Sequence, residues 1–193
     1  MPSERYYIDS EINSGDFITL EGSEYHHLAN VMRTQLGDCV EIVNGKGSLA
    51  NAEITNLEKK KALLSIKDVF KEAPPSFNTI LAQAIPRGNR LDFILEKGTE
   101  LGMTEIWLFP GKLSERKDIS ANQLERMQAL LIAAMKQSGR LYLPKIVVKA
   151  ALSKWTSFDF PAFFGDVQPD APRFKAVWQP NTGAIICIGP ESG

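Results

Sequence analysis

Apolar residues recur along the chain in two rhythms, and the change between them divides the sequence. Over roughly the first seventy residues, apolar and polar residues alternate over short stretches, which is typical of half-buried β-strands joined by turns. One helix, capped by Ser23, is expected to interrupt them, with Leu28 and Met32 on its apolar face. The strands expected from this pattern, with the spacing of a small β-barrel, lie at 5–8, 17–20, 39–43, 49–57 and 62–70.

Two short segments rich in turn-forming residues divide and end this first part. The tetrapeptide 44–47, Asn-Gly-Lys-Gly, predicts a hairpin turn, because Asn and Gly accept positive φ at little cost. The stretch 72–76, Glu-Ala-Pro-Pro-Ser, predicts a linker, because consecutive prolines cannot continue a strand ladder. We therefore expect two domains, at 1–73 and 74–193.

The second part opens with a complete strand–helix–strand pattern. The apolar run 79–84 predicts a strand, and Pro86-Arg87-Gly88-Asn89 ends it with a turn. A helix capped by Asn89 follows, and Gly102 is expected to close it in the left-handed conformation. The run 105–109 predicts a second strand, which the crossover helix makes parallel to the first. The helical stripe expected to face the sheet is Leu91, Ile94, Leu95, Gly98 and Leu101.

The polar face of this helix admits two interpretations. Asp92, Glu96 and Glu100 repel one another at four-residue spacing, so a partner for these carboxylates is plausible. The alternative is a solvated face on which Lys97 offsets its acidic neighbours. Spacing alone does not separate the two.

Further elements complete an α/β pattern with a parallel sheet. Ser120 and Gln123 form a capping box that opens a long helix, and Gly139 is expected to end it. Strands are expected at 145–149 and 184–188. Ligands of open parallel sheets bind beyond the carboxyl ends of the strands, so the loops 86–89 and 110–120 should lie on the working edge. The buried stripe expected on the long helix is Leu124, Met127, Leu131, Ala134 and Met135.

Charge is unevenly distributed although the net charge is only −1. Residues 1–74 hold 8 Lys/Arg against 12 Asp/Glu, whereas residues 110–150 hold 8 Lys/Arg against 3 Asp/Glu, a local charge of +5. This distribution indicates a localised anion-binding surface rather than general attraction to polyanions.

The remaining composition argues against several classes of protein. No 18-residue apolar run and no apolar signal-peptide core are present, so a cytoplasmic protein without a membrane segment is expected. Cys39 and Cys187 lie in separate apolar runs and are interpreted as reduced core residues. His26 and His27 are adjacent on a helix and point apart, so we expect no metal site.

Five stretches of this sequence coincide, in order, with one known family. The chain resembles the ribosomal RNA small-subunit methyltransferase E family of the SPOUT superfamily, whose members methylate N3 of a uridine in 16S rRNA. Only the stretch from 165 to 180 matches weakly. The matching segments are YHHLANVMRTQLGDCVEIVNGKG (25–47), LAQAIPRGNRLDFILEKGTELGM (81–103), SERKD (114–118), LERMQALLIAAMKQSGRLYLPKI (124–146) and IGPESG (188–193).

The resemblance implies a fold and partners. It implies a small PUA-like, RNA-binding β-barrel before a SPOUT parallel sheet with a C-terminal trefoil knot. It also implies S-adenosyl-L-methionine as cofactor, 16S rRNA in the small ribosomal subunit as substrate, and a homodimer. The family's knot segment has no counterpart before Gly193, and an apolar strand at 184–188 needs further cover. The natural chain is therefore expected to continue.

The resemblance also implies site residues. The family's cofactor loop corresponds to Gly189, Pro190, Glu191, Ser192 and Gly193, and a second cofactor loop corresponds to Gln179 and Pro180. Uracil N3 must lose its proton while the methyl group is held in line, so nearby charges are sought. Lys97 and Arg116 are expected as electrostatic groups and Glu100 as an orienting carboxylate. The residues expected to contact RNA are Arg33, Lys46, Arg87, Arg90, Arg126, Gln137 and Arg140.

Two other classes compete with this hypothesis. The first is a non-catalytic RNA-binding protein that keeps the barrel and basic loops of the family without its cofactor site. The second is a different nucleotide-binding α/β enzyme, which is disfavoured because neither GxGxxG nor GxxxxGK[ST] follows any strand.

Overall fold

The computed structural model describes residues 4–86, 90–112 and 118–190. Two compact units are present. The first combines Met1–Pro74 with Met135–Tyr142, and the second combines Pro75–Ala134 with Leu143–Gly193.

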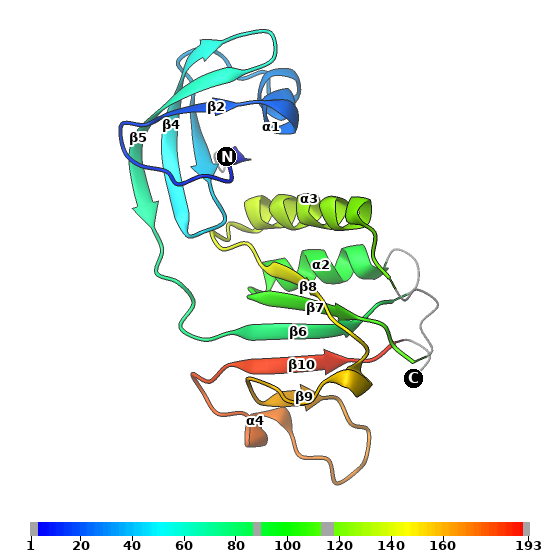
Figure 1. The fold of residues 1–193 in the computed structure, drawn as a ribbon. Coiled ribbons are helices and arrows are strands. Elements are labelled where there is room, and N and C mark those ends of the chain that lie inside the picture. Colours follow the sequence, from blue (N-terminus) through cyan, green and yellow to red (C-terminus); the bar gives the residue numbers. More distant parts are fainter. Residues whose placement is uncertain (1–3, 87–89, 113–117, 191–193) are drawn as a thin grey trace. The chain divides into compact units, whose positions relative to one another are not determined.

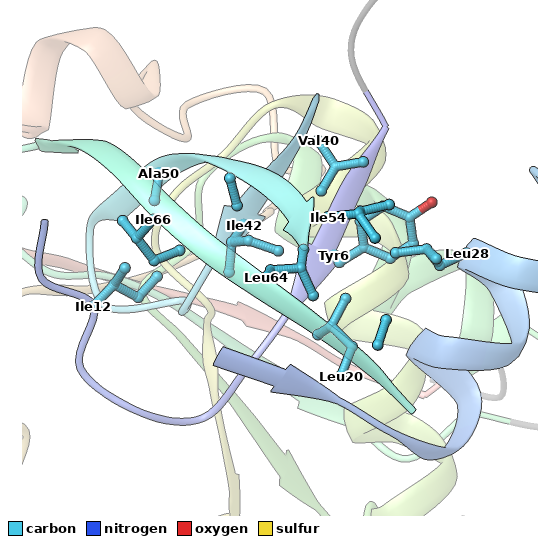
Figure 2. Close-up of a cluster of buried hydrophobic side chains, with 12 residues drawn as sticks. Tyr6, Ile12, Leu20, Leu28, Val40, Ile42, Ala50, Ile54, Leu64 and Ile66 are labelled. Atoms are coloured by element: carbon cyan, nitrogen blue, oxygen red, sulfur yellow. The ribbon is translucent and has the colours of Figure 1, made fainter. Parts of the chain in front are cut away.

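The first unit is built on a curled β-sheet. Its strand order across the described residues is β1-β3-β4-β5-β2, with β1 parallel to β3 and the other pairs antiparallel. Figure 2 shows apolar side chains from these strands, among them Tyr6, Ile42 and Leu64, gathered into one core. The predicted strands are confirmed to within a residue at each end. The elements are β1 (Arg5–Tyr7), β2 (Phe17–Leu20), α1 (Gly22–His26), η1 (His27–Val31), β3 (Cys39–Val43), β4 (Ser48–Leu57) and β5 (Ala62–Lys71).

The helical insertion differs from the prediction. Ser23 lies inside α1 rather than at its cap, and Glu21 holds the cap position without a side-chain hydrogen bond. The helix continues as the π-helical turn η1, and the chain then leaves it through Arg33 at φ 55°. Leu28 is buried as predicted, whereas Met32 is 41% exposed because the wider turn rotates it out of the apolar face.

The predicted hairpin turn at 44–47 is confirmed. The buried Asn44 side chain accepts hydrogen bonds at Oδ1 from the backbone N–H groups of Lys46 and Ser48. Gly45 and Gly47 both have positive φ, at 67° and 93°. This turn fixes the register of β3 against β4.

The second unit contains a parallel sheet. Its strand order across the described residues is β8-β7-β6-β10-β9, and each neighbouring pair is parallel. Figure 1 shows α2 and α3 on the same side of this sheet. The chain therefore combines a PUA-like barrel with an α/β unit, as predicted. The elements are β6 (Thr79–Ala84), α2 (Arg90–Glu100), β7 (Glu105–Phe109), α3 (Ala121–Ser138), β8 (Lys145–Val148), η2 (Leu152–Lys154), β9 (Ala162–Phe164), α4 (Phe174–Val177) and β10 (Ala184–Ile188).

The helix signals of the second unit are largely confirmed. The Ser120 backbone N–H donates to Gln123 Oε1 at 2.9 Å, and the Gln123 N–H donates back to Ser120 Oγ at 3.3 Å, which forms the capping box. Gly102 and Gly139 both have φ 81°. The stripe on α2 is wrong at Leu101, which is 72% exposed because it follows the last helical residue. Asn89, the predicted cap of α2, lies outside the described residues.

Opposite α2 and α3, aromatic side chains cover the sheet. Trp155 packs edge-on against Trp107 and Phe109, with ring centroids 5.6 and 5.3 Å apart. Lys149 lies over the Trp107 ring, with Nζ 4.0 Å from its centroid. These contacts and Phe160 cover the apolar residues that β6, β7 and β10 present on this face.

One cysteine prediction is wrong. Cys39 is exposed, because it begins β3 opposite Glu53 and points to the outer face of the curled sheet. Cys187 packs against the apolar cluster below the parallel sheet, and burial raises the pKa of its thiol. Both cysteines are free. Within the described ranges, no helix is long and apolar enough to cross a membrane. The trefoil knot stays a prediction.

Candidate functional site

The carboxyl ends of three neighbouring strands meet at one edge of the parallel sheet. Ile188 at the end of β10 is in register with Gln83 on β6, and Ala84 is in register with Phe109 at the end of β7. Gly189 and Pro190 follow β10 and leave from this same edge. After β6 the chain leaves from this edge too, at Ile85 and Pro86, and after β7 it does so at residues 110–112. Ligands of open parallel sheets bind at such an edge.

Some predicted site residues lie outside the described residues. Their flanking strands end at the edge just described, but nothing further follows for the residues themselves. They are Arg87, Arg116, Glu191, Ser192 and Gly193.

The bend after β10 leaves room for a ligand. Among the described residues, no atom lies within 4 Å of a Cβ added at Gly189, and this glycine is exposed. Ile188, immediately before it, is 43% exposed. Exposed backbone at Gly189 beside an exposed aliphatic side chain suits an adenosyl group, which needs both polar and apolar contact.

Cationic side chains stand in the amino-terminal turns of α2 and α3. Arg90 begins α2, and Arg126 in the second turn of α3 forms an ion pair with Asp92 in the first turn of α2. The Arg126 side chain is 67% exposed. Because α2 follows β6 and α3 follows β7, these turns lie toward the carboxyl edge of the sheet.

Lys97 and Glu100 occupy the other end of α2. Lys97 Nζ donates to Glu100 Oε1 at 2.7 Å and to Glu96 Oε1 at 3.1 Å. The hydrogen bonds to Glu100 and Glu96 raise the pKa of Lys97, so this group is a cation and not a base at neutral pH. Helical rise places Lys97 about 10 Å along the axis from Arg90. The structure thus supports the interpretation in which Lys97 offsets its acidic neighbours for Glu96 and Glu100, whereas Asp92 has a partner outside α2 in Arg126.

The other residues predicted to contact RNA belong to the first unit. Arg33 is exposed in the turn after η1, and Lys46 lies in the β3–β4 turn, where its Nζ is 3.0 Å from Asp9 Oδ1. The hydrogen bond with Asp9 raises the pKa of Lys46. Gln137 and Arg140 are exposed at the carboxyl end of α3, in the segment assigned to the first unit. The predicted RNA contacts therefore fall into two groups, one on each unit.

The structure separates two Gln-Pro pairs in this sequence. Gln179 and Pro180 lie in the turn that leads into the amino end of β10, where the Thr182 hydroxyl donates to the Gln179 carbonyl at 2.6 Å. Gln168 and Pro169 instead follow the carboxyl end of β9, the strand beside β10. Gln179 and Pro180 remain predicted site residues, but strand direction favours the second pair as neighbours of the bend at Gly189.

Sequence reasoning missed Gln83. It stands near the carboxyl end of β6, in an otherwise apolar strand, and its polar side chain is only 4% exposed. The signal was a lone amide within an otherwise apolar run. Metal ligands are not gathered anywhere in the described ranges, where no group of three His, Cys, Asp or Glu side chains could hold an ion.

Family comparisons assign both parts of the chain. Residues 73–193 match the model of an RNA methyltransferase domain, and residues 20–67 match that of an RNA methyltransferase PUA domain. Several curated relatives carry the name ribosomal RNA small subunit methyltransferase E. The chain is 28% identical to the Bacillus subtilis protein over 98% of this chain and 81% of that one. It is 30% identical to the Synechocystis protein over 89% and 50%, and 26% identical to the Buchnera aphidicola protein over 78% and 61%. The chain thus spans between about half and four fifths of these relatives.

Solved structures agree with this assignment. A ribosomal RNA small subunit methyltransferase E from Neisseria gonorrhoeae, bound to S-adenosyl methionine, superposes with a TM-score of 0.83 at 30% identity over 99% of this chain and 81% of that one. A predicted RNA methyltransferase from Thermotoga maritima superposes with a TM-score of 0.79 at 26% identity over 98% and 82%. From its two domain matches and these relatives, the chain belongs to the ribosomal RNA small subunit methyltransferase E family of RNA methyltransferases.

Proposed function

We propose that this protein methylates N3 of a uridine in 16S rRNA of the small ribosomal subunit, with S-adenosyl-L-methionine as methyl donor. The observation that carries the proposal is the meeting of the Gly189–Pro190 bend with the ends of β6 and β7 at one edge of the sheet. The exposed bend that would hold the cofactor therefore lies on the same side of the second unit as the amino-terminal turns of α2 and α3, whose cations would bind RNA.

The reaction joins the methyl carbon to uracil N3, breaks the bond between that carbon and sulfur, and releases the N3 proton to solvent or a base. When bound, the cofactor supplies an activated methyl group on a sulfonium. The protein has to hold the uracil in line, because orientation contributes most to such transfers. N3 is hidden in a base pair, so the uridine must also leave its stack.

Each group of residues has a proposed task. Gly189 and Pro190, with Glu191, Ser192 and Gly193 beyond them, hold the cofactor, and Gln168 and Pro169 join them from the end of β9. Arg90 and Arg126 bind RNA phosphates near the reaction, together with Arg87. The first unit adds contacts farther along the RNA through Arg33, Lys46, Gln137 and Arg140. Arg116 is the proposed electrostatic group for the developing N3 anion.

Lys97 and Glu100 are proposed to support this arrangement indirectly. Their ion pair lies in the last turn of α2, away from the edge where Gly189 stands. A structural role for this pair fits the exposed face of α2 better than contact with uracil does. We further propose a homodimer, which light scattering of the purified protein tests.

The test measures binding and chemistry separately. Calorimetry with S-adenosylmethionine reports cofactor binding, and transfer of a tritiated methyl group to small ribosomal subunits reports catalysis. Reverse transcription then locates the product, because a methyl group on N3 blocks Watson–Crick pairing and stops the polymerase at one position. We expect cofactor binding and a single stop in 16S rRNA.

Two results would overturn the proposal. RNA binding without cofactor binding would identify a non-catalytic RNA-binding member of the family. A methyl group at a position that does not stop reverse transcription would confirm methyltransferase activity but exclude N3 of uracil as its target.

A further inference from the structure

Hydrogen bonds link three segments of the first unit that lie far apart in the sequence. The Gly47 N–H in the β3–β4 turn donates to the Leu141 carbonyl at 2.9 Å, and the Glu72 N–H just after β5 donates to the Gly47 carbonyl at 2.8 Å. The Tyr142 hydroxyl completes the set by donating to the Glu72 carbonyl at 2.9 Å. We call Gly47, Glu72, Leu141 and Tyr142 the turn junction.

The Tyr142 ring occupies the space that a side chain at Gly47 would need. A Cβ added at Gly47 would lie 2.4 Å from Tyr142 Oη and 3.0 Å from the Glu72 carbonyl oxygen. Gly47 also has φ 93°, which other residues rarely adopt. The ring therefore packs directly on the backbone of the β3–β4 turn.

Both segments that Tyr142 joins also have anchors of their own. The β3–β4 turn is held by Asn44, whose Oδ1 accepts the N–H groups of Lys46 and Ser48. The segment after α3 is anchored by Leu141, which is buried. Tyr142 is half-buried, and its contacts therefore act mainly on the placement of one segment relative to the other.

Two of the proposed RNA-binding cations flank the turn junction. Lys46 directly precedes Gly47 and forms an antiparallel bridge with Tyr142, and Arg140 directly precedes Leu141. Each cation is therefore one residue away from the hydrogen bond between Gly47 and Leu141. Both cationic residues are exposed.

Resting on the proposed function, we propose that Tyr142 is a positioning residue for RNA, which holds Lys46 and Arg140 beside each other so that both bind one stretch of the RNA backbone. Phosphates of one strand follow each other at a regular spacing, so two cations bind them best at a fixed separation. Cations that move independently would have to be ordered during binding, which lowers affinity. The ion pair of Lys46 with Asp9 opposes phosphate binding only weakly, because both side chains are exposed.

The test removes the Tyr142 hydroxyl and keeps the ring. Tyr142→Phe loses the bond to the Glu72 carbonyl. Tyr25→Phe is the matched control, because the Tyr25 hydroxyl donates to the Glu58 carbonyl at 2.6 Å elsewhere in the first unit. Tyr142→Leu is a second variant, which also removes the ring from the turn. Urea denaturation checks that each variant is folded.

We expect an effect on RNA and not on the chemical step. Filter binding with 16S rRNA and initial rates should show Kd and KM for RNA raised about three- to tenfold in Tyr142→Phe. The value of kcat and the cofactor Kd from calorimetry should stay unchanged, and Tyr25→Phe should bind RNA like the wild type. In a Lys46→Met/Arg140→Met background, Tyr142→Phe should have no further effect, because the cations that it positions are gone.

Two results would overturn the inference. An equal loss of RNA affinity from Tyr142→Phe with and without the two cations would show that the hydroxyl only stabilises the barrel. Unchanged RNA affinity in both folded Tyr142 variants would show that the turn junction does not position the cations. Failure of the wild-type protein to bind RNA or transfer methyl would instead contradict the proposed function.

Discussion

Arg126 on α3 donates from Nη2 to the carboxylate of Asp92 on α2, so one ion pair joins the amino-terminal turns of the two helices that cover the sheet. The Arg126 side chain is 67% exposed and that of Asp92 is 29% exposed. An exposed pair of this kind stabilises a protein by about 0–1 kcal/mol. Arg126 therefore remains available to an RNA phosphate at small structural cost.

We predict that Arg126→Gln weakens RNA binding without unfolding the protein. Losing one phosphate contact should lower the slope of log K against log salt by about 1, and stability should fall by less than about 1 kcal/mol. Filter binding at several salt concentrations measures the slope. Asp92→Asn is the control, because it breaks the same ion pair and leaves the cation. Equal RNA binding by wild type and both variants would show that the ion pair only joins the two helices and that Arg126 does not bind RNA.

Lys97 should not control the pH dependence of the reaction. Hydrogen bonds to Glu100 and Glu96 raise the pKa of Lys97 above its ordinary value of 10.5. A folded-state pKa above the unfolded one gives stability that is present below the unfolded pKa and lost as pH rises through the folded pKa. Between about pH 6 and 9 the side chain therefore keeps its proton, and it cannot act as a general base.

The prediction is tested with paired substitutions. Lys97→Arg and Lys97→Met should both keep methyl-transfer rates within about threefold of wild type, since the ion pair lies away from the carboxyl edge. Their pH–rate profiles should superimpose on that of the wild type. A loss of tenfold or more in Lys97→Met, rescued in Lys97→Arg, would restore the electrostatic role expected from the sequence.

The sequence allowed β6, α2 and β7 to be predicted because each signal for this unit is local. Period-two and helical patterns, a capping box and two left-handed glycines each act over a few residues, and β6 and β7 have the bounds expected from them. The register that brings Gln83 beside Ile188 joins residues about a hundred positions apart. Local patterns carry no information about such pairings, so the missed amide could not be placed at the edge.

The two wrong predictions in the first unit, the helix cap at Ser23 and the burial of Cys39, also depend on contacts that local sequence does not reveal. Ser23 carries the chemistry of a helix cap, but α1 begins earlier and widens into a π-helical turn because Leu28 is drawn into the barrel core. Cys39 alternates with buried residues, yet its strand starts with the outward-facing position. In both cases the local sequence is compatible with two arrangements, and tertiary packing determines which of them forms.

The ion pair between Lys136 and Glu24 should contribute to the stability of the first unit. Lys136 Nζ lies 2.7 Å from Glu24 Oε1, and the two side chains are 18% and 19% exposed. Glu24 Oε2 also accepts the Tyr7 backbone N–H at 3.0 Å. Lys136→Met should lower the free energy of unfolding by about 2 kcal/mol, because it leaves a half-buried carboxylate without its cation. Urea denaturation measures the change.

The neighbouring Gln137→Met is the control for that measurement. Gln137 is exposed on the same helix, so its replacement should change stability by less than about 0.5 kcal/mol. If Lys136→Met were as stable as this control, the ion pair would contribute nothing, and residues 135–142 would be held by their other contacts, among them the hydrogen bonds of Leu141 with Gly47 and of Tyr142 with Glu72.

Arg33 occupies a backbone conformation that its residue type disfavours. Its φ is 55°, and the turn is held by Thr34, whose N–H and hydroxyl both donate to the Leu28 carbonyl at 3.1 Å. A non-glycine residue in this region costs about 1 kcal/mol, which suggests that the exposed guanidinium is kept for binding. We predict that Arg33→Gly raises stability by up to about 1 kcal/mol and weakens RNA binding.

Asn181→Gly is the matched control for Arg33→Gly, since Asn181 also has positive φ, at 61°, and is exposed in the turn before β10. It should leave RNA affinity unchanged and raise stability less, because Asn tolerates this conformation better than Arg does. Denaturation curves and RNA titrations at two salt concentrations are measured on all three proteins. A gain in stability for Arg33→Gly with no loss of RNA affinity would show that Arg33 does not contribute to RNA binding and that the left-handed turn matters only for the fold of the barrel.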